Sequence, residues 1–426
     1  MTDAPAEIAV SEVVYRDDLY PRIEKSQRTV EQYAEDLDVL PPIEVNQHNE
    51  LIDGWHRWTA HRKVGAEHIR VTVTETTGDS HFLELAIRRN ASHGLQLSLE
   101  DKRDMARRIY NGTPERERDG KKAQLASILS ISERSVRNWL SRIDKDAKEA
   151  RDRRIFAMWL ACCTQQEIAE AESLPLGTVK TLTNGLDEIG NLAKNIQADA
   201  DHATDFTAPI YNVWKQQEKT PGVSHFGNSE IRWVDNLLYL YTRPFDVVVD
   251  PFAGSGSTAD LCRKRVRRYW VSDRLPVVGR EDIIRKHDLT EGLPPLPRWQ
   301  DVRLVYLDPP YWKQAEGRYS SDPQDLANME LDDFTKMLAG IVNGFAGKLA
   351  DAHIALIIQP TQWNAPERQF TDHIRDMLRE VDLPVAQRIS VPYESQQCNA
   401  QMVEWAKQNR QVLTLTREIV VWRVQR

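Results

Sequence analysis

Several features that would place this chain in a familiar class are missing from its sequence. It has no run of about 18 apolar residues, so we expect no membrane-spanning helix and no membrane partner. The first residues, MTDAPAEIAVSEVV, are acidic and lack the basic-then-apolar order of a signal peptide, which predicts a cytoplasmic protein. Cysteine is scarce and its spacing offers no zinc pattern, so we expect reduced, structural thiols and no metal site. The cysteines are Cys162, Cys163, Cys262 and Cys398.

An overall positive charge is also lacking. The formal net charge is -8, which argues against a protein that coats DNA. The distribution is uneven, because residues 88–154 carry 18 Lys and Arg against 11 Asp and Glu. Such a basic segment is compatible with a nucleic-acid footprint and equally with a set of solvated helices. Charge alone does not decide between these two interpretations.

The composition is that of a globular protein of two or three domains, with 426 residues, 41% hydrophobic and 28% charged. Strand signals mix with helices at first, and from about residue 84 to 185 the pattern is helical. Periodicity then fades, until strands and helices alternate from about residue 224. We therefore predict an α+β domain over 1–110, a helical region over 111–190, a linker over 191–223 and an α/β domain over 224–426.

Two helix-turn-helix candidates lie in the helical region. In the first, KKAQLASILSISERSVRNWLSRI, Ser132 can cap the second of two short helices. In the second, TQQEIAEAESLPLGTVKTLTN, Thr164 and Glu167 form a capping-box pattern. Helix pairs of this form occur in DNA-binding proteins and also in bundles that never touch DNA. If these pairs read DNA, the candidate contact residues on the second helices are Arg134, Arg137 and Lys180.

The C-terminal part alternates strands with helices, which is typical of a largely parallel sheet covered on both faces. Its apolar strand segments are FDVVVDPF, RRYWVSD, VRLVYLDPPYW, HIALIIQP and LTREIVVWRV. The fold class that we expect is therefore multidomain, with an N-terminal α+β domain, a helical region and a C-terminal Rossmann-like α/β domain with a mainly parallel sheet.

A glycine-rich turn follows the first of these strands. Gly254 and Gly256 let the backbone approach a ligand before the next helix begins, although Gly-x-Gly also occurs in tight connections without a ligand. The next strand ends at Asp273, a carboxylate placed to accept hydrogen bonds from ribose hydroxyls. Asp288 follows a further short apolar stretch. Taken singly, each acid is also explained as a turn residue at a strand end.

The most specific feature is Asp308-Pro309-Pro310-Tyr311 at the end of a buried strand. Two prolines after an acid end the strand and fix the backbone. The Asp308 carboxylate and the Pro309 carbonyl can accept the two hydrogens of an exocyclic base amine, and the Tyr311 ring can stack on the base. The sequence therefore predicts chemistry on a base that has been flipped out of its stack.

Together, DPFAGSGS and DPPY resemble the motifs of the amino-methylating DNA methyltransferases, which make N6-methyladenine or N4-methylcytosine. The resemblance covers residues 224–426 and implies S-adenosylmethionine as cofactor and double-stranded DNA as substrate. It implies that Asp273 binds the ribose of the cofactor and Asp288 its adenine, and the Asp of DPPY favours adenine as the target base. The cofactor-binding residues implied are Asp250, Pro251, Phe252, Ala253, Gly254, Ser255, Gly256, Asp273 and Asp288. The catalytic residues implied are Asp308, Pro309, Pro310 and Tyr311.

Three other interpretations stay open at this point. The same site could methylate N4 of cytosine. The chain could be a DNA-binding partition or regulatory protein whose methyltransferase domain is vestigial. The substrate could also be an amine of RNA or protein. The sequence is compatible with a homodimer and with a partner nuclease, and it fixes neither.

One departure from the resembled family concerns the order of the motifs. In the familiar subgroup with a DPF-type loop, the DPPY strand usually comes first, whereas here it follows the loop. The catalytic half has no room for a large target-recognition domain, and its only candidates are the segments WKQAEGRYSSDPQDLANM and PYESQQCNAQMVEWAKQNRQ. We therefore expect the N-terminal half to supply much of the duplex affinity and target choice.

The N-terminal part resembles the ParB/sulfiredoxin-like domain over residues 8 to about 145. LIDGWHRWTAHRKVG is similar to the signature box of that family and IRRNASHGLQLSLEDKR to its later Asn-containing box, and a helix-turn-helix follows, as in ParB-type proteins. Their box binds CTP and is Gly-Glu-Arg-Arg-like. Here it reads Gly54-Trp55-His56-Arg57, which puts CTP binding by this domain in doubt. The box has no cysteine, so sulfiredoxin activity is not expected.

Overall fold

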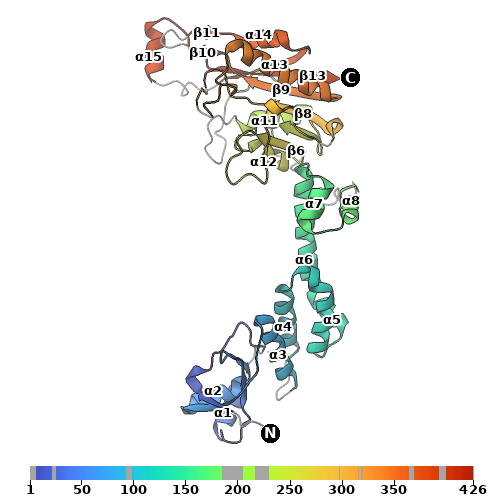
Figure 1. Cartoon of the computed structure of the whole chain (residues 1–426), viewed down its shortest axis with the longest axis vertical. Coiled ribbons are helices and arrows are strands. Elements are labelled where there is room, and N and C mark those ends of the chain that lie inside the picture. The colour runs from blue at the N-terminus through green and yellow to red at the C-terminus, as the bar shows by residue number, and fades with distance from the viewer. Residues whose placement is uncertain are drawn as a thin grey trace. The chain divides into compact units, whose positions relative to one another are not determined.

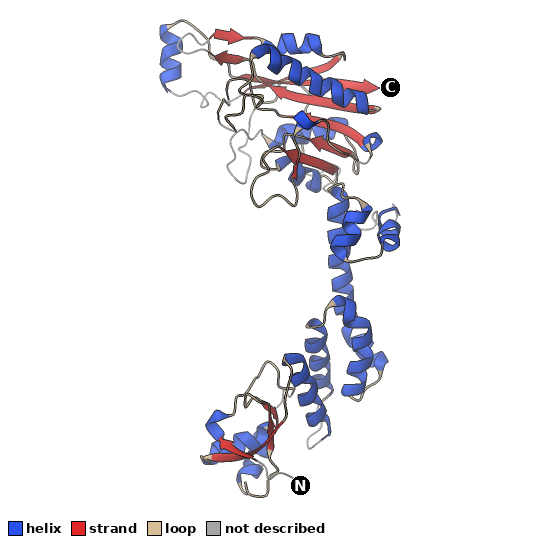
Figure 2. Ribbon diagram, viewed as in Figure 1, coloured by secondary structure: helices blue, strands red, loops and turns tan. Residues whose placement is uncertain are grey.

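A computed structural model describes residues 6–21, 25–92, 98–184, 205–215, 230–296, 298–314, 316–317, 320–363, 369–392 and 400–425. The chain divides into two compact units, Met1–Ala150 and Arg151–Arg426, and each is described by itself (Figure 1, Figure 2). The helical region predicted over 111–190 falls partly in each unit. Among the described residues, no helix has the length and apolarity needed to cross a membrane.

The first unit begins with a four-stranded sheet in the order β1-β4-β2-β3, in which only β2 and β4 run parallel. Alternating apolar side chains of these strands pack against Trp58 of α2 in one small core. The strands are β1 (Ala6–Ala9), β2 (Ile43–Val45), β3 (Leu51–Asp53) and β4 (His68–Val73). The helices are α1 (Gln27–Ala34), α2 (Trp55–Val64) and α3 (Asp79–Ser92).

The box that resembles the ParB signature forms the corner between β3 and α2. Gly54 has φ +107, and a Cβ there would lie 2.7 Å from the Ile43 side chain, so the corner requires glycine. Arg57 donates a hydrogen bond of 2.7 Å to Asp53, and Nε2 of His56 accepts one of 3.1 Å from a backbone N–H. The side chains of His56 and Arg57 therefore both make hydrogen bonds within the fold.

The first helix-turn-helix candidate consists of α5 (Arg118–Ile128) and the start of α6 (Glu133–Leu160), after α4 (Leu99–Asn111) and the short helix η2 (Glu115–Glu117). Its apolar residues Leu125, Leu129, Val136 and Leu140 are buried together. The second helix is 28 residues long, so the prediction of two short helices was wrong here. No Gly or Pro interrupts α6, and i,i+4 ion pairs such as Lys145–Glu149 favour its continuation.

The second unit is built on a seven-stranded mixed sheet in the order β12-β13-β9-β8-β5-β6-β7. Neighbouring strands from β9 to β7 run parallel, and β13 is antiparallel to both of its neighbours. The strands are β5 (Val247–Asp250), β6 (Arg268–Asp273), β7 (Arg285–Lys286), β8 (Val302–Leu307), β9 (Asp351–Ile358), β12 (Val385–Pro392) and β13 (Thr416–Gln425).

Helices cover both faces of this sheet. Because side chains alternate along a strand, Val248 joins one buried core with Leu237 and Ala259, and Val249 joins another with Phe345 and Ile374. The first core lies under α11 (Ile231–Tyr241) and α12 (Ser257–Lys264), and the second under α13 (Leu331–Lys348) and α14 (His373–Glu380). Short helices η3 (Leu289–Glu291) and η4 (Trp299–Asp301) lie in the connections.

The order of the strands reverses between β5 and β8. From β5 the chain passes to β6 and β7 on one side, and then to β8 and β9 on the other. In open α/β sheets such a reversal leaves a crevice outside the carboxyl ends of the strands, and ligands bind there. The residues that follow β5, β6 and β8 are therefore placed to share one site.

Two further insertions extend from this sheet (Figure 1). A hairpin of β10 (Thr361–Trp363) and β11 (Gln369–Thr371) lies between β9 and α14. Helix α15 (Ala400–Gln408) lies between β12 and β13. The sequence predicted the second of these insertions as a loop and did not anticipate the hairpin.

The second helix-turn-helix candidate, α7 (Gln165–Glu172) and α8 (Leu176–Asn184), belongs to the second unit. Just before it, the Trp159 ring contacts Phe245 at 5.6 Å between centroids and lies 4.5 Å from the Arg268 guanidinium. Glu167 forms an ion pair of 3.7 Å with Arg285. These contacts fix the helix pair to the β6–β7 edge of the sheet.

Part of the predicted linker also packs on this unit. Within residues 205–215, Asp205 forms an ion pair of 2.7 Å with buried Arg265, and the Trp214 N–H donates to the Ser390 carbonyl at 2.8 Å. Residues 185–204 and 216–229, which include most of the predicted linker and its boundary at 224, lie outside the described residues.

Among the described residues, Cys162, Cys163 and Cys262 are free thiols, and Cys398 lies outside the described residues. Burial raises the pKa of Cys162 to about 11. A raised pKa and burial both disfavour the thiolate, which fits a structural cysteine.

Candidate active site

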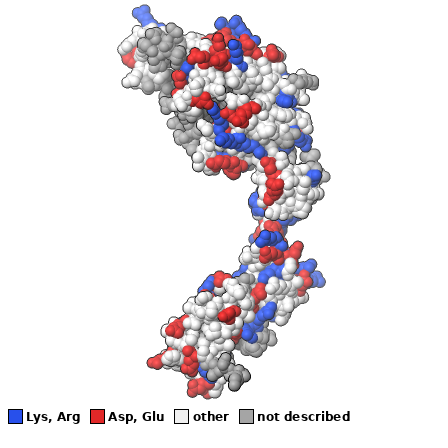
Figure 3. Space-filling view, viewed as in Figure 1, with Lys and Arg blue, Asp and Glu red and all other residues white. Residues whose placement is uncertain are grey.

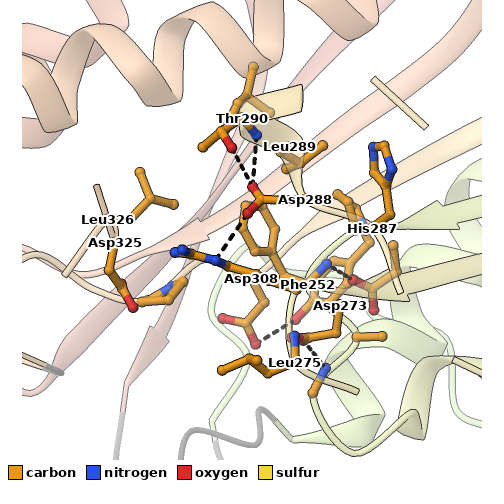
Figure 4. A pocket seen from close by; sticks show the side chains of 18 of the residues that line it. Phe252, Asp273, Leu275, His287, Asp288, Leu289, Thr290, Asp308, Asp325 and Leu326 are labelled. Atoms are coloured by element: carbon orange, nitrogen blue, oxygen red, sulfur yellow. Dashed lines mark hydrogen bonds and ion pairs between the residues drawn. The ribbon is translucent and has the colours of Figure 1, made fainter. Parts of the chain in front are cut away.

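A pocket of about 320 Å³ opens where the strand order reverses, outside the carboxyl ends of β5, β6 and β8 (Figure 4). This volume is in the range of small-molecule sites. The predicted site residues that line it are Asp250, Pro251, Phe252, Ala253, Gly254, Asp273, Asp288, Asp308 and Pro310. Ser255, Gly256, Pro309 and Tyr311 are adjacent in the chain but do not line it.

The glycine-rich loop wraps the end of β5 and is tied to the end of β6. The Gly254 N–H donates to the Asp273 carboxylate at 2.9 Å, and Gly254 has φ +51. Gly256 has φ +82 and precedes α12, but a Cβ on it would meet Arg280 and Ile284 at 3.1 Å and would not enter the pocket. Of the two glycines, only Gly254 lines the pocket, and its left-handed backbone is one that glycine adopts without strain.

Asp250 is the most deeply buried carboxyl group of the pocket, with 1% of its surface exposed. Burial raises its pKa to about 7, Asp308 and Asp273 add to the rise, and hydrogen bonds from Thr258 and the Phe252 N–H oppose it. A cation bound nearby would oppose this rise and favour the ionised form of Asp250.

Asp273 and Asp288 are both held by backbone N–H groups. Asp273 accepts hydrogen bonds of 2.9 Å from Gly254 and Leu275. Asp288 accepts from the Thr290 N–H at 2.9 Å and from its hydroxyl at 2.8 Å. Burial tends to raise the pKa of Asp288, but the hydrogen bonds from Thr290 and the charge of Arg274 outweigh it. The pKa of Asp288 is therefore lowered. Both side chains are fixed in place at the rim where the resemblance puts ribose and adenine.

Arg274 is a pocket residue that the sequence analysis missed. Its Nε pairs with Asp288 at 3.0 Å and its Nη2 with Asp322 at 2.5 Å, so it joins the β7–η3 segment to the loop after β8. The only signal in the sequence was its position directly after Asp273 at a strand end. Its partner Asp322 lies 48 residues further along the chain.

The Asp308 carboxylate lies between two phenols. It accepts a hydrogen bond of 3.4 Å from Tyr306 and one of 3.3 Å from Tyr311. The Tyr311 oxygen in turn accepts one of 3.4 Å from Arg417, whose guanidinium lies 4.4 Å from the Trp233 ring. The sequence analysis missed Tyr306 and Arg417, although Tyr306 is two residues before Asp308 on the same strand.

Acidic groups dominate the pocket. Asp250, Asp273, Asp288, Asp308 and Asp325 line it, together with two basic side chains, Arg274 and His287. Such an environment suits a ligand that carries positive charge.

The three candidate DNA contacts lie outside this pocket. Arg134 and Arg137 are on α6 in the first unit, and Lys180 is exposed on α8 in the second. Arg137 pairs with Glu133 at 2.5 Å on the surface. On the face drawn in Figure 3, basic and acidic side chains are interspersed over both units and no single basic patch stands out.

Comparison with known families gives one match. A family model described as DNA methylase, for N6/N4 methyltransferases, matches residues 99–276. The matched segment contains the glycine-rich loop and Asp273 and ends before Asp308. It bears out the resemblance to the amino-methylating DNA methyltransferases and, with it, S-adenosylmethionine as the cofactor. It does not distinguish adenine from cytosine. No curated protein matches the chain.

The similar solved structures include ParB proteins and methyltransferases. One is the C-terminally truncated chromosome-partitioning protein ParB from Caulobacter crescentus complexed to the centromeric parS site, at 18% identity over 45% of this chain and 90% of that one, with TM-score 0.23. Two more are methyltransferases. The 1,6-didemethyltoxoflavin-N1-methyltransferase of Burkholderia thailandensis shows 12% identity over 46% and 78% of the chains, with TM-score 0.29. A SAM-dependent methyltransferase of Archaeoglobus fulgidus shows 14% over 46% and 94%, with TM-score 0.27. Scores this low carry no weight for fold or function.

Proposed function

We propose that this chain, part of which matches the N6/N4 DNA methylases, transfers the methyl group of S-adenosylmethionine to the N6 amine of adenine in double-stranded DNA. The observation that carries the proposal is that the Asp308 carboxylate and the glycine-rich loop line one pocket, although they are more than 50 residues apart in the chain. Methyl transfer requires the donor and the amine to be held in a single site.

The residues of the pocket fit this cofactor. Gly254 of the loop lines the pocket, Asp273 is placed for ribose hydroxyls, and the acidic lining complements a sulfonium. When bound, the cofactor supplies a methyl group that its sulfonium has already activated. The exposed Leu275 side chain at the pocket rim can cover an adenine ring.

The protein's part in the reaction is to position the amine. Asp308 accepts one amine hydrogen in the pocket, and the carbonyl of Pro309, which lies between the lining residues Asp308 and Pro310, accepts the other, so that the nitrogen lone pair points toward the methyl carbon. Hydrogen bonds from Tyr306 and Tyr311 restrict the Asp308 carboxylate, which keeps this acceptor in place before the base arrives. Most of the rate gain then comes from orientation and electrostatics.

The choice of adenine rests on the Asp in the first position of Asp308-Pro309-Pro310-Tyr311. The test is to incubate the full chain with S-adenosylmethionine and unmethylated duplex DNA, and to analyse the nucleosides by mass spectrometry. We expect N6-methyladenine. N4-methylcytosine instead would make cytosine the target. If neither appeared while the cofactor still bound, methylation of a DNA base would be refuted, and the alternatives would be a vestigial domain or an amine of RNA or protein as the substrate.

We also propose that Arg134, Arg137 and Lys180 contact the duplex, since each lies on the second helix of a helix-turn-helix pair. Arg137→Ala should weaken DNA binding by about 1–3 kcal/mol and relax the choice of base at one position if Arg137 reads a base edge. Fluorescence anisotropy at several salt concentrations measures this. Equal weakening of all sequences, with a smaller salt dependence, would make it a phosphate contact. Unchanged affinity would remove Arg137 from the interface.

A further inference from the structure

A buried arginine lies at the edge of the sheet where β8 and β9 end. β13 runs antiparallel to β9, and its Glu418 pairs with Ile358, the last residue of β9, so β13 begins at that edge. Arg417 directly precedes Glu418, and only 3% of its surface is exposed. Burial of a charged group is costly unless its charge and its N–H groups find partners. The partners of Arg417 therefore bear on its role.

Arg417 and Asp308 extend from the same face of the sheet. Ile419 of β13 and Tyr306 of β8 belong to one buried core, the core that lies under α11. Side chains two residues apart on a strand point to the same face. Arg417 is two residues before Ile419 on β13. Asp308 is two residues after Tyr306, directly beyond the end of β8. Both side chains therefore lie on the α11 side of the sheet, at its carboxyl edge.

The Tyr311 phenol joins the two charged groups. Nη1 of Arg417 donates to the phenol oxygen at 3.4 Å, and the phenol donates to Oδ1 of Asp308 at 3.3 Å. A guanidinium can only donate, so the phenol must be the acceptor in the first bond and keeps its own hydrogen for the carboxylate. The guanidinium is itself placed by the Trp233 ring of α11, which lies 4.4 Å from it. Arg417 thus sets the direction of the bond between Tyr311 and Asp308.

The Tyr311 side chain is restrained at both of its ends. Its backbone follows Pro309 and Pro310, whose rings fix the backbone, and its hydroxyl is held by the two hydrogen bonds. The side chain is half-buried, so part of it stays accessible. In the proposed reaction Asp308 receives the amine of the target base, and a base bound there lies beside this phenol ring. A flipped base is commonly read by stacking against an aromatic side chain.

We propose that Arg417 is a positioning residue, which holds the Tyr311 ring in the orientation in which the flipped target base stacks on it. This inference rests on the proposed function. A side chain that is already ordered loses less conformational entropy when its ligand arrives, so Arg417 should favour capture of the base. Neither Arg417 nor Tyr311 lines the pocket that we assign to the cofactor, so binding of S-adenosylmethionine should not depend on this pair.

The test is a double-mutant cycle in the full chain, with Arg417→Met, Tyr311→Phe and the double variant. Met keeps an unbranched apolar stem in the core and removes the donor. We expect Arg417→Met to lower kcat/KM for DNA by about three- to tenfold, the cost of ordering the ring upon binding. The double variant should lose no more than Tyr311→Phe alone, because both single changes remove the same hydrogen bond.

A spectroscopic readout reports the stacking itself. The duplex carries 2-aminopurine, a fluorescent base, in place of the target adenine, and stacking on a ring quenches its fluorescence. At saturating protein we expect brighter 2-aminopurine with Arg417→Met than with wild type. The matched control is Arg423→Met. Arg423 is on the same strand, but its side chain is 53% exposed at the far end of β13, so this variant should match the wild type.

Two results would overturn the inference. If the losses of the two single variants multiply in the double variant, or if 2-aminopurine is equally quenched without the guanidinium, Arg417 has only a structural role. Should Arg417→Met fail to fold, Arg417→Lys keeps a buried cation and enters the same cycle. Lys lacks the planar fork of Arg, so we expect the same loss from it, and full activity would contradict the role. A wild type that methylates no DNA base would refute the proposed function instead.

Discussion

Asp308→Ala is expected to reduce kcat for methyl transfer by about 10²–10³-fold or more, while the affinity for S-adenosylmethionine stays within a few fold. The carboxylate is the charged acceptor for the amine, and this contact acts mainly on the chemical step. The loop residues at Gly254 and Asp273 bind each other without Asp308, so the cofactor side of the pocket should survive. Single-turnover methylation and isothermal titration measure the two quantities.

Tyr306→Phe is the matched control for this variant. It removes the hydroxyl that donates to Asp308 at 3.4 Å and leaves the carboxylate and the buried ring in place. We expect a much smaller loss than for Asp308→Ala, since Tyr311 still donates to the same group. Near-normal turnover by Asp308→Ala would refute its assignment as the amine acceptor.

Gly254→Val should weaken S-adenosylmethionine binding by about 100-fold or more. Gly254 lines the pocket and has φ +51, which a β-branched residue adopts only at a cost of about 1–3 kcal/mol. A change of backbone conformation at this position would also disturb the hydrogen bond that the Gly254 N–H donates to Asp273. Isothermal titration of the purified variant measures the loss.

Gly279→Val is the control that separates the effect of backbone strain from the effect of a side chain placed in the pocket. Gly279 has φ +85, and a Cβ on it would meet nothing within 4 Å. It does not line the pocket, so Gly279→Val carries a comparable strain without obstructing a ligand. Its cofactor affinity should stay near wild type. If both variants bound S-adenosylmethionine equally well, Gly254 would have no part in the cofactor site.

The parts of the site that the sequence predicted are those written in contiguous motifs. Asp250 and Asp273 end strands, and Asp308 directly follows one. Parallel strands bring their carboxyl ends to one edge of the sheet. The order of the motifs along the chain was therefore enough to predict that these three side chains lie close together. Arg417 reaches Tyr311 from 106 residues away, and Arg274 reaches Asp322 from 48 residues away. Such pairs depend on how loops and sheet edges pack, which no local pattern encodes.

Two features of the fold escaped prediction for a related reason. The length of α6 was missed because two short helices were expected in the first helix-turn-helix, although no Gly or Pro interrupts the second helix. The placement of α7 and α8 depends on Trp159 packing with Phe245 and Arg268, residues that are about 100 positions away. The hairpin β10–β11 was missed because its strands have only three residues each, too few for a periodic signal.

The contacts that bind α7 and α8 to the catalytic unit bear on how this chain can be recombined. Residues 191–223 are polar and aperiodic, which makes them an obvious place to join a different DNA-binding region to the catalytic domain. A junction there would strip Trp159 from Arg268 and Glu167 from Arg285, and would expose the apolar surface around Phe245. A chimaera that keeps the second unit, Arg151–Arg426, intact should therefore be joined upstream of residue 151. The helix pair α7–α8 then stays with the sheet on which it packs.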